Sequence, residues 1–209
     1  MNGLQEETKK TFLSIIDELL LDTSSKAAEI SLFKLLNYNR SITTELFSQN
    51  IEEYLYFMVT QRVTASFTTG LKNAIKKFSE TLIKAQDGQI IKNPKPYDLK
   101  FKLKNGEEYW LDIKSINDPN FTDEQYIKER KEKADNNRSK YRLYIYDDEN
   151  QYDGDYHLNG NDFWELLAGF ENARPEIFKL INGSANKFST STIIKETHNR
   201  LLREWRMQE

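Results

Sequence analysis

The stretch YDLKFKLKNGEEYWLDIKS, residues 97–115, decides the fold class that we expect for this chain. Apolar and polar residues alternate from Tyr97 to Leu103, and Asn105-Gly106 precedes a second alternating run. Alternation with a period of two is typical of half-buried strands, and Asn-Gly is a strong signal for a tight hairpin. The stretch therefore predicts a β-hairpin, with Tyr97 and Leu99 on the same face of its first strand.

Before the hairpin, apolar residues recur at helical spacing, which predicts several helices in the first third of the chain. We expect the first helix to end at residues 22–25, which are Asp, Thr and two Ser, and a second helix to end at about Asn39. Hydroxyl residues within 41–44 are candidate caps for a third helix. Thr68-Thr69-Gly70 is expected to end that helix, so that a fourth begins at Leu71.

Further strands and helices are predicted on both sides of the hairpin. Residues 89–92 and 141–146 are predicted to be short strands, and a charged helix capped by Thr122 is predicted at 122–137. After an acidic loop at 147–155, three more helices are predicted at 162–170, 175–181 and 191–206.

This order of elements predicts an α/β (α+β) protein in which helices flank a central mixed β-sheet. We expect one domain over residues 1–209, with a helical N-terminal part at 1–69, a core at 70–147 and a C-terminal helical part at 148–209.

The composition excludes several kinds of functional site. The chain has 209 residues with no Cys and 2 His, which excludes disulfide scaffolds, zinc–cysteine sites, iron–sulfur clusters, cysteine nucleophiles and multi-histidine metal sites within one chain. No apolar run is long enough to cross a membrane, and the N-terminus has no hydrophobic signal region. We therefore expect a cytoplasmic protein without a membrane partner.

The charges of the hairpin suggest metal chemistry. Asp112 and Lys114 are two residues apart on the predicted return strand, so their side chains share a face, and Asp98 lies opposite them across the hairpin. Two carboxylates suit Mg²⁺, and a lysine beside the metal can position water or neutralise charge on a phosphate. The alternative is a solvent-exposed ion pair, which contributes at most about 1 kcal/mol of stability.

The run Pro96-Tyr97-Asp98, followed by Asp112-Ile113-Lys114, resembles the PD-(D/E)XK nuclease superfamily, to which most type II restriction endonucleases belong. The resemblance covers residues 71–147, about a third of the chain. Tyr97 separates the proline from the aspartate, whereas the two are adjacent in the pattern that gives the family its name.

The resemblance implies a restriction-endonuclease-like core and a role for each matched residue. Asp98 and Asp112 would be the metal ligands, the backbone carbonyl of Ile113 a third ligand, and Lys114 the catalytic lysine. Glu80 is the nearest candidate for an acid that many members carry on the preceding helix, although a solvated helix charge is the simpler interpretation.

The function implied is that of a type II restriction endonuclease, which hydrolyses phosphodiester bonds of double-stranded DNA at a specific site with Mg²⁺ and acts as a homodimer. Two alternatives remain open: a repair or transposition nuclease of the same fold, and a non-catalytic DNA-binding or interaction module.

Charge patterning suggests where DNA would be bound. The net charge of the chain is −3, but residues 70–142 carry 17 basic and 12 acidic side chains. Basic side chains pair with phosphates and guanine edges, and Asn pairs with adenine. The candidate DNA-binding residues lie in the predicted helix at 122–137 and just after it; a solvated helix face is the alternative. They are Lys128, Arg130, Lys133, Asn136, Asn137 and Arg138.

Overall fold

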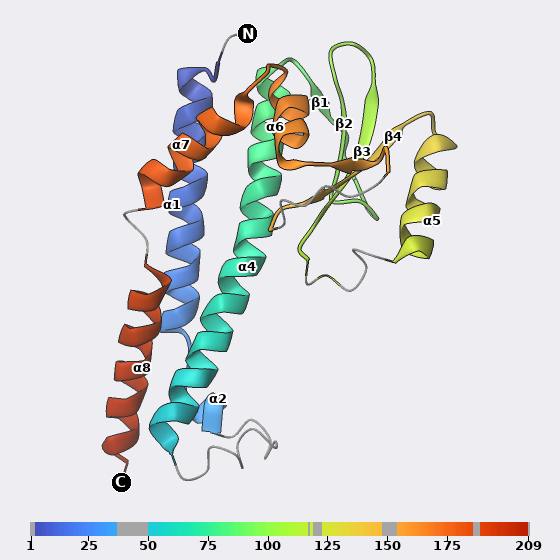
Figure 1. Ribbon diagram of the computed structural model, residues 1–209. Coiled ribbons are helices and arrows are strands. Elements are labelled where there is room, and N and C mark those ends of the chain that lie inside the picture. The colour runs from blue at the N-terminus through green and yellow to red at the C-terminus, as the bar shows by residue number, and fades with distance from the viewer. Residues whose placement is uncertain are drawn as a thin grey trace. The chain divides into compact units, whose positions relative to one another are not determined.

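The computed structural model describes residues 3–36, 50–116, 118, 123–147, 154–185 and 189–208. It is a mixed α/β structure, as the order of elements predicted (Figure 1). In chain order the elements are α1 (Glu6–Ala28), α2 (Leu32–Leu36), α4 (Ile51–Ala85), β1 (Gln89–Ile90), β2 (Leu99–Lys102), β3 (Glu108–Lys114), α5 (Glu124–Asp135), β4 (Lys140–Ile145), β5 (His157–Leu158), α6 (Gly160–Ala168), α7 (Ala173–Ala185) and α8 (Thr190–Arg206).

Contacts divide the chain into two compact units. The sheet unit comprises Met1–Ile15 and Lys72–Gly183, and the helical unit comprises Ile16–Leu71 and Ser184–Glu209. The division between Leu71 and Lys72 lies next to residue 70, where the core was expected to begin. Residues 148–183 were assigned to a C-terminal helical part, and they belong to the sheet unit.

The sheet has five strands in the order β1-β2-β3-β4-β5. β1, β2 and β3 are antiparallel neighbours, whereas β3 with β4 and β4 with β5 are parallel. The hairpin between β2 and β3 is confirmed: Gly106 has a φ of 89°, and the Asn105 side chain accepts a hydrogen bond from Glu107 N at 3.0 Å. Because α5 connects the parallel strands β3 and β4, the sheet presents one face to this helix.

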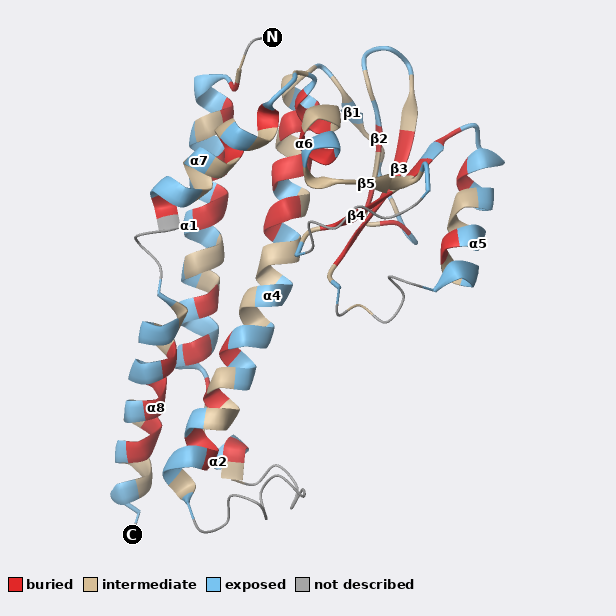
Figure 2. Cartoon of the chain, in the orientation of Figure 1, coloured by how far each residue is buried: buried red, intermediate tan, exposed pale blue. Residues whose placement is uncertain are grey.

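Aromatic side chains cover both faces of the sheet. On the α5 face, the buried cluster consists of Tyr97, Trp110, Ile127, Ala134, Tyr141 and Leu143. On the other face, Tyr144 of β4 stacks on Phe163 of α6 with ring centroids 3.7 Å apart. Within the sheet, Figure 2 shows buried residues along β3 and β4, the two strands between these layers.

Tyr97 is not on the face that alternation predicted. It packs against Trp110 on the α5 side, with centroids 4.8 Å apart, whereas Leu99 pairs with Leu111 on the opposite side. β2 begins only at Leu99, so the two-residue period does not extend back to Tyr97.

The predicted helix breaks at 22–25 and 68–70 are wrong, because α1 and α4 continue through them as helices of 23 and 35 residues. The hydroxyls of Thr23 and Thr69 donate to backbone carbonyls four residues earlier, at 2.9 Å each, so both hydroxyls find acceptors within a continuous helix. A Cβ on Gly70 would lie 2.6 Å from Leu19 Cδ1, so this glycine permits close packing of α1 against α4.

The remaining boundaries agree with the sequence to within a few residues, with two additions. The short strand β5 was not expected, and the cap of α5 is Asp123, one residue after the predicted one: the Asp123 carboxylate accepts from Tyr126 N at 3.0 Å. The candidate caps at 41–44, the predicted end of the second helix at Asn39, and Thr122 lie outside the described residues.

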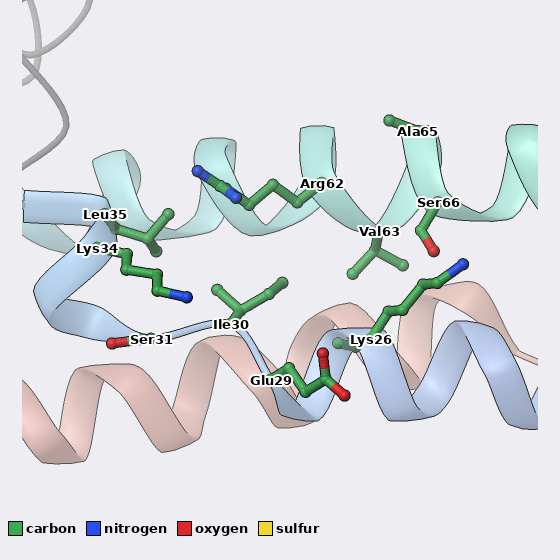
Figure 3. A pocket seen from close by; sticks show the side chains of 11 residues that line it. Lys26, Glu29, Ile30, Ser31, Lys34, Leu35, Arg62, Val63, Ala65 and Ser66 are labelled. Atoms are coloured by element: carbon green, nitrogen blue, oxygen red, sulfur yellow. The ribbon is translucent and has the colours of Figure 1, made fainter.

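The helical unit has its own core. Tyr54, Leu55 and Val59 of α4 pack with apolar residues of α2 and α8, and Tyr54 OH donates to Leu35 O at 2.9 Å. A cavity of about 360 Å³ between α1, α2 and α4 is lined by Lys26, Arg62 and others (Figure 3). None of the predicted catalytic residues lines it. None of the described helices combines the length and the apolar content that crossing a bilayer would require.

Candidate active site

Asp98 lies where the ladder between β2 and β3 ends. Its backbone N donates to Leu111 O at 3.1 Å, and its side-chain Oδ2 accepts from Ile113 N at 2.9 Å. The other carboxylate oxygen, Oδ1, lies 3.0 Å from Nζ of Lys72 on α4. The carboxylate therefore takes the place of a strand residue beside β3 and is held in a fixed position.

Asp112 is buried on the α5 face, with 1% of the residue exposed. Its Oδ2 accepts from Tyr141 OH at 3.1 Å and from Tyr126 OH at 3.4 Å, and Arg130 Nε is 4.0 Å away. Burial raises the pKa of the Asp112 carboxyl above its usual range; the charge of Arg130 opposes this rise and that of Asp98 adds to it.

Burial and the charge of Asp112 also raise the pKa of the Tyr141 hydroxyl, as they do for Tyr126. Both phenols therefore keep their protons at neutral pH, and both can donate to the carboxylate.

Arg130 lies beside Asp112, enclosed by aromatic rings. Its guanidinium carbon is 4.8 Å from the centre of the Tyr97 ring and 4.7 Å from that of Tyr126, and its side chain is 15% exposed. The Tyr97 hydroxyl donates to Arg130 O at 2.9 Å. Nη1 of Arg130 is buried and has no hydrogen-bond partner among the described residues. This cation stabilises the ionised form of Asp112.

Lys114 shares the face of Asp112, as the period of two predicted, and only 10% of its side chain is exposed. Its Nζ lies 3.1 Å from Asp118 Oδ2 and 5.2 Å from the centre of the Tyr126 ring. Burial acts to lower the pKa of Lys114, but the hydrogen bond with Asp118 and the nearby negative charges outweigh it and raise the pKa. Lys114 is therefore a cation at neutral pH and can stabilise negative charge, but it is a poor base.

The structure brings Asp98, Asp112 and Lys114 together on one end of the sheet. Asp112 and Lys114 share a face of β3, and Asp98 accepts a hydrogen bond from the backbone N of Ile113, the residue between them. Residues 111 and 113 direct their backbone groups to the same neighbouring strand, so the Ile113 carbonyl points toward the side on which Asp98 lies.

Two carboxylates and one carbonyl are oxygen donors of the kind that Mg²⁺ takes alongside several waters, so the residues fit that ion. Among the described residues, no group of three or more His, Cys, Asp or Glu forms a ready-made metal cluster. A cation held here would therefore rely on water and on phosphate oxygens for its remaining ligands.

Glu80 lies elsewhere on α4. It is eight residues beyond Lys72, which is about 12 Å along a helix axis, so Lys72 rather than Glu80 is the helix residue that reaches Asp98. The residue that α4 presents to Asp98 is therefore a lysine and not an acid.

The candidate DNA-binding residues fall into two groups. Lys128, Lys133, Asn136, Asn137 and Arg138 are exposed. Lys128 is 3.9 Å from Glu132, and the Asn137 amide donates to Lys133 O at 2.8 Å. Arg130 instead points inward to Asp112, so its cation belongs to the carboxylate site.

The sequence reasoning missed the partners of the two aspartates. Arg130 is three residues after Ile127 and four before Ala134, both buried, so the helical period already placed it on the inner face of α5. Tyr141 is two residues before Leu143 on β4 and therefore shares the face of that apolar residue, which likewise indicated an inward phenol. Lys72 gave no such signal, because its role depends on α4 continuing past Gly70.

In comparisons with known proteins, no protein-family model matches the chain, and no curated protein matches it.

Proposed function

We propose that the protein is a Mg²⁺-dependent endonuclease that hydrolyses phosphodiester bonds of double-stranded DNA, with a restriction-endonuclease-like core. The observation that carries the proposal is that Asp98, Asp112 and Lys114 all lie at the end of the β2–β3 pair that is remote from the hairpin turn, where Asp98 bonds to the backbone of Ile113. The order α4-β1-β2-β3-α5-β4, with β3 parallel to β4, supports it, because it is the helix, three strands, helix and strand that the resemblance implies.

In this reaction the residues of the chain have distinct tasks. Asp98, Asp112 and the Ile113 carbonyl would hold Mg²⁺, which supplies an acidified water and neutralises phosphate charge when bound. Lys114, a fixed cation, stabilises the negative charge that grows on the phosphate oxygens as the water oxygen attacks phosphorus. The water gives up a proton to solvent as its oxygen bonds to phosphorus, the bond from phosphorus to the leaving sugar oxygen breaks, and that oxygen takes up a proton from solvent.

The finer assignment, a type II restriction endonuclease, adds that cleavage occurs at a specific site and on both strands. Two strands of a palindromic site are matched by a two-fold dimer, which presents one active site to each strand. The exposed Lys, Arg and Asn residues of α5 and the turn after it are suited to contacts with phosphates and bases.

The test is digestion of plasmid DNA by the purified full chain. Discrete bands with Mg²⁺ or Mn²⁺ are expected, and no cleavage with Ca²⁺ or excess chelator. Asp98→Asn and Asp112→Asn are expected to lose cleavage by orders of magnitude. The matched control is Asp87→Asn, at an exposed carboxylate in the Lys104 ion pair, and it is expected to cleave normally.

Other outcomes would contradict the proposal in recognisable ways. Cleavage in chelator would reject the metal mechanism. A smear instead of bands would favour a repair-type nuclease, and DNA binding without any cleavage would favour the non-catalytic module.

A further inference from the structure

Each carboxylate of the site has one oxygen that accepts hydrogen bonds from other groups of the protein. For Asp98 this is Oδ2, which accepts from Ile113 N at 2.9 Å. For Asp112 it is also Oδ2, which receives the hydroxyls of Tyr141 and Tyr126. The Oδ1 atoms are thus the ones that would face an external cation.

At Asp98 a cation already occupies that position. Lys72 Nζ lies 3.0 Å from Oδ1, and the two side chains are 34% and 24% exposed. An ammonium group with this exposure can move into solvent without being buried elsewhere. The comparable pair at Lys114 is with Asp118, so Lys114 does not compete for the same oxygen.

We propose that Lys72 takes the place of the divalent cation at Asp98 in the metal-free protein, and that the metal must displace it. This inference rests on the proposed function, because it concerns the same metal site. A monovalent ammonium and a divalent ion cannot both lie within 3 Å or so of one oxygen without strong mutual repulsion. Lys72 therefore neutralises Asp98 until metal arrives and weakens the affinity for metal.

The experiment measures metal affinity directly, without cleavage. Mn²⁺ is titrated into the full chain in the absence of DNA, and free Mn²⁺ is read from its electron paramagnetic resonance signal. Lys72→Met keeps the length of the side chain and removes its charge. It is expected to bind Mn²⁺ about three- to tenfold more tightly than the wild type, the range expected from losing a partly exposed ion pair and its repulsion of the metal.

Two further variants make the comparison specific. Lys72→Arg retains the cation and is expected to bind Mn²⁺ no more tightly than the wild type. Lys104→Met removes an equally charged side chain from an exposed pair with Asp87 in the same unit, and it is expected to leave the affinity unchanged. Lys72→Gln replaces Lys72→Met if circular dichroism shows that the latter does not fold.

The results separate this inference from the proposed function. If Asp98→Asn abolishes Mn²⁺ binding and Lys72→Met binds no more tightly than the wild type, the Lys72 inference is overturned and the metal site stands. If neither the wild type nor Lys72→Met binds Mn²⁺, the metal site and the inference both fail.

Discussion

Asp112 is a buried carboxylate whose ionised form the fold tolerates at the expense of stability. Its pKa is raised by burial, and Arg130 and Lys114 only partly offset this. The folded protein therefore holds the Asp112 proton to a higher pH than the unfolded chain does. Ionisation of Asp112 then favours unfolding, and the stability of the metal-free protein falls as pH rises through that raised pKa.

Asp112→Asn is accordingly expected to be more stable than the wild type at pH 7 in chelator. A gain of a few degrees in Tm is expected, since about 1 kcal/mol corresponds to roughly 2–4 °C in a chain of this size. Below the usual pKa of a carboxyl the two proteins should melt alike, because Asp112 is then protonated in both states. Thermal melts across pH check this, and a lower Tm for the variant at pH 7 would show that Arg130 makes the charge net stabilising.

Lys114 separates the catalytic interpretation from the ion-pair interpretation. In the proposed function, this cation beside Asp112 would contribute charge stabilisation and water positioning, each worth about 10²-fold or more in rate. Lys114→Ala is therefore expected to abolish cleavage. It is expected to change the affinity for non-specific DNA little, because losing one phosphate contact among many changes the slope of log K against log salt concentration by only about one.

Cleavage rates on plasmid DNA measure this, with circular dichroism as the control for folding. If the Lys114→Ala protein digested plasmid DNA normally, the assignment of this motif as a nuclease active site would be rejected.

At the scale of elements, α5 carries basic residues of two kinds. Arg130 faces inward to Asp112, while Lys133 is exposed near the end of the helix. Without Arg130 the buried charge of Asp112 is left without compensation, whereas the guanidinium, which is 15% exposed, reaches solvent when Asp112 is neutral. Exposed charges such as that of Lys133 affect stability little.

Arg130→Met is therefore expected to destabilise the protein by about 3 kcal/mol, the lower end of the range for buried pairs, because the guanidinium is partly exposed and 4.0 Å from the carboxylate. Lys133→Met is expected to leave stability within about 0.5 kcal/mol and to weaken DNA binding at every sequence alike. Urea unfolding and salt-dependent DNA titrations measure the two effects. Equal stability losses in both variants would contradict this division of α5.

The same elements show how far the sequence could lead. The hairpin and the shared face of Asp112 and Lys114 follow from a two-residue period and an Asn-Gly turn, which are local properties of the chain. The helix ends could not be located in that way. Thr69 and Gly70 are residue types common at helix ends, but in the fold Gly70 lies inside α4 where Leu19 packs closely against it, a contact between residues distant in sequence.

The partners of the carboxylates were unpredictable for the same reason. Lys72 reaches Asp98 only because α4 is unbroken, and Tyr141 reaches Asp112 only because β4 is paired in parallel with β3. Inward-facing polar residues were visible in the periodicity of α5, but periodicity alone does not say which charge they would face.

At the scale of the whole molecule, the described part of each chain supplies one group of Asp98, Asp112 and Lys114. Under the proposed function this group would serve one strand at a time, so cleavage of both strands by one bound assembly would require two chains. On supercoiled plasmid, a dimer is expected to yield linear DNA with little nicked circle, whereas independent monomers would accumulate nicked circle first.

Mixing wild-type chains with inactive chains distinguishes a dimer from independent monomers. With a fixed amount of wild type and an excess of Lys114→Ala chains, most dimers that contain a wild-type chain have one active and one inactive site, so each cleavage event hydrolyses only one strand. Nicked circle should then become the main product, and the yield of linear DNA should fall with the fraction of inactive chains. Exchange of chains before DNA is added is checked with a size-tagged variant by native electrophoresis. If exchanged mixtures still give linear DNA directly, with no rise in nicked circle, one chain is able to cut both strands and the dimer requirement is wrong.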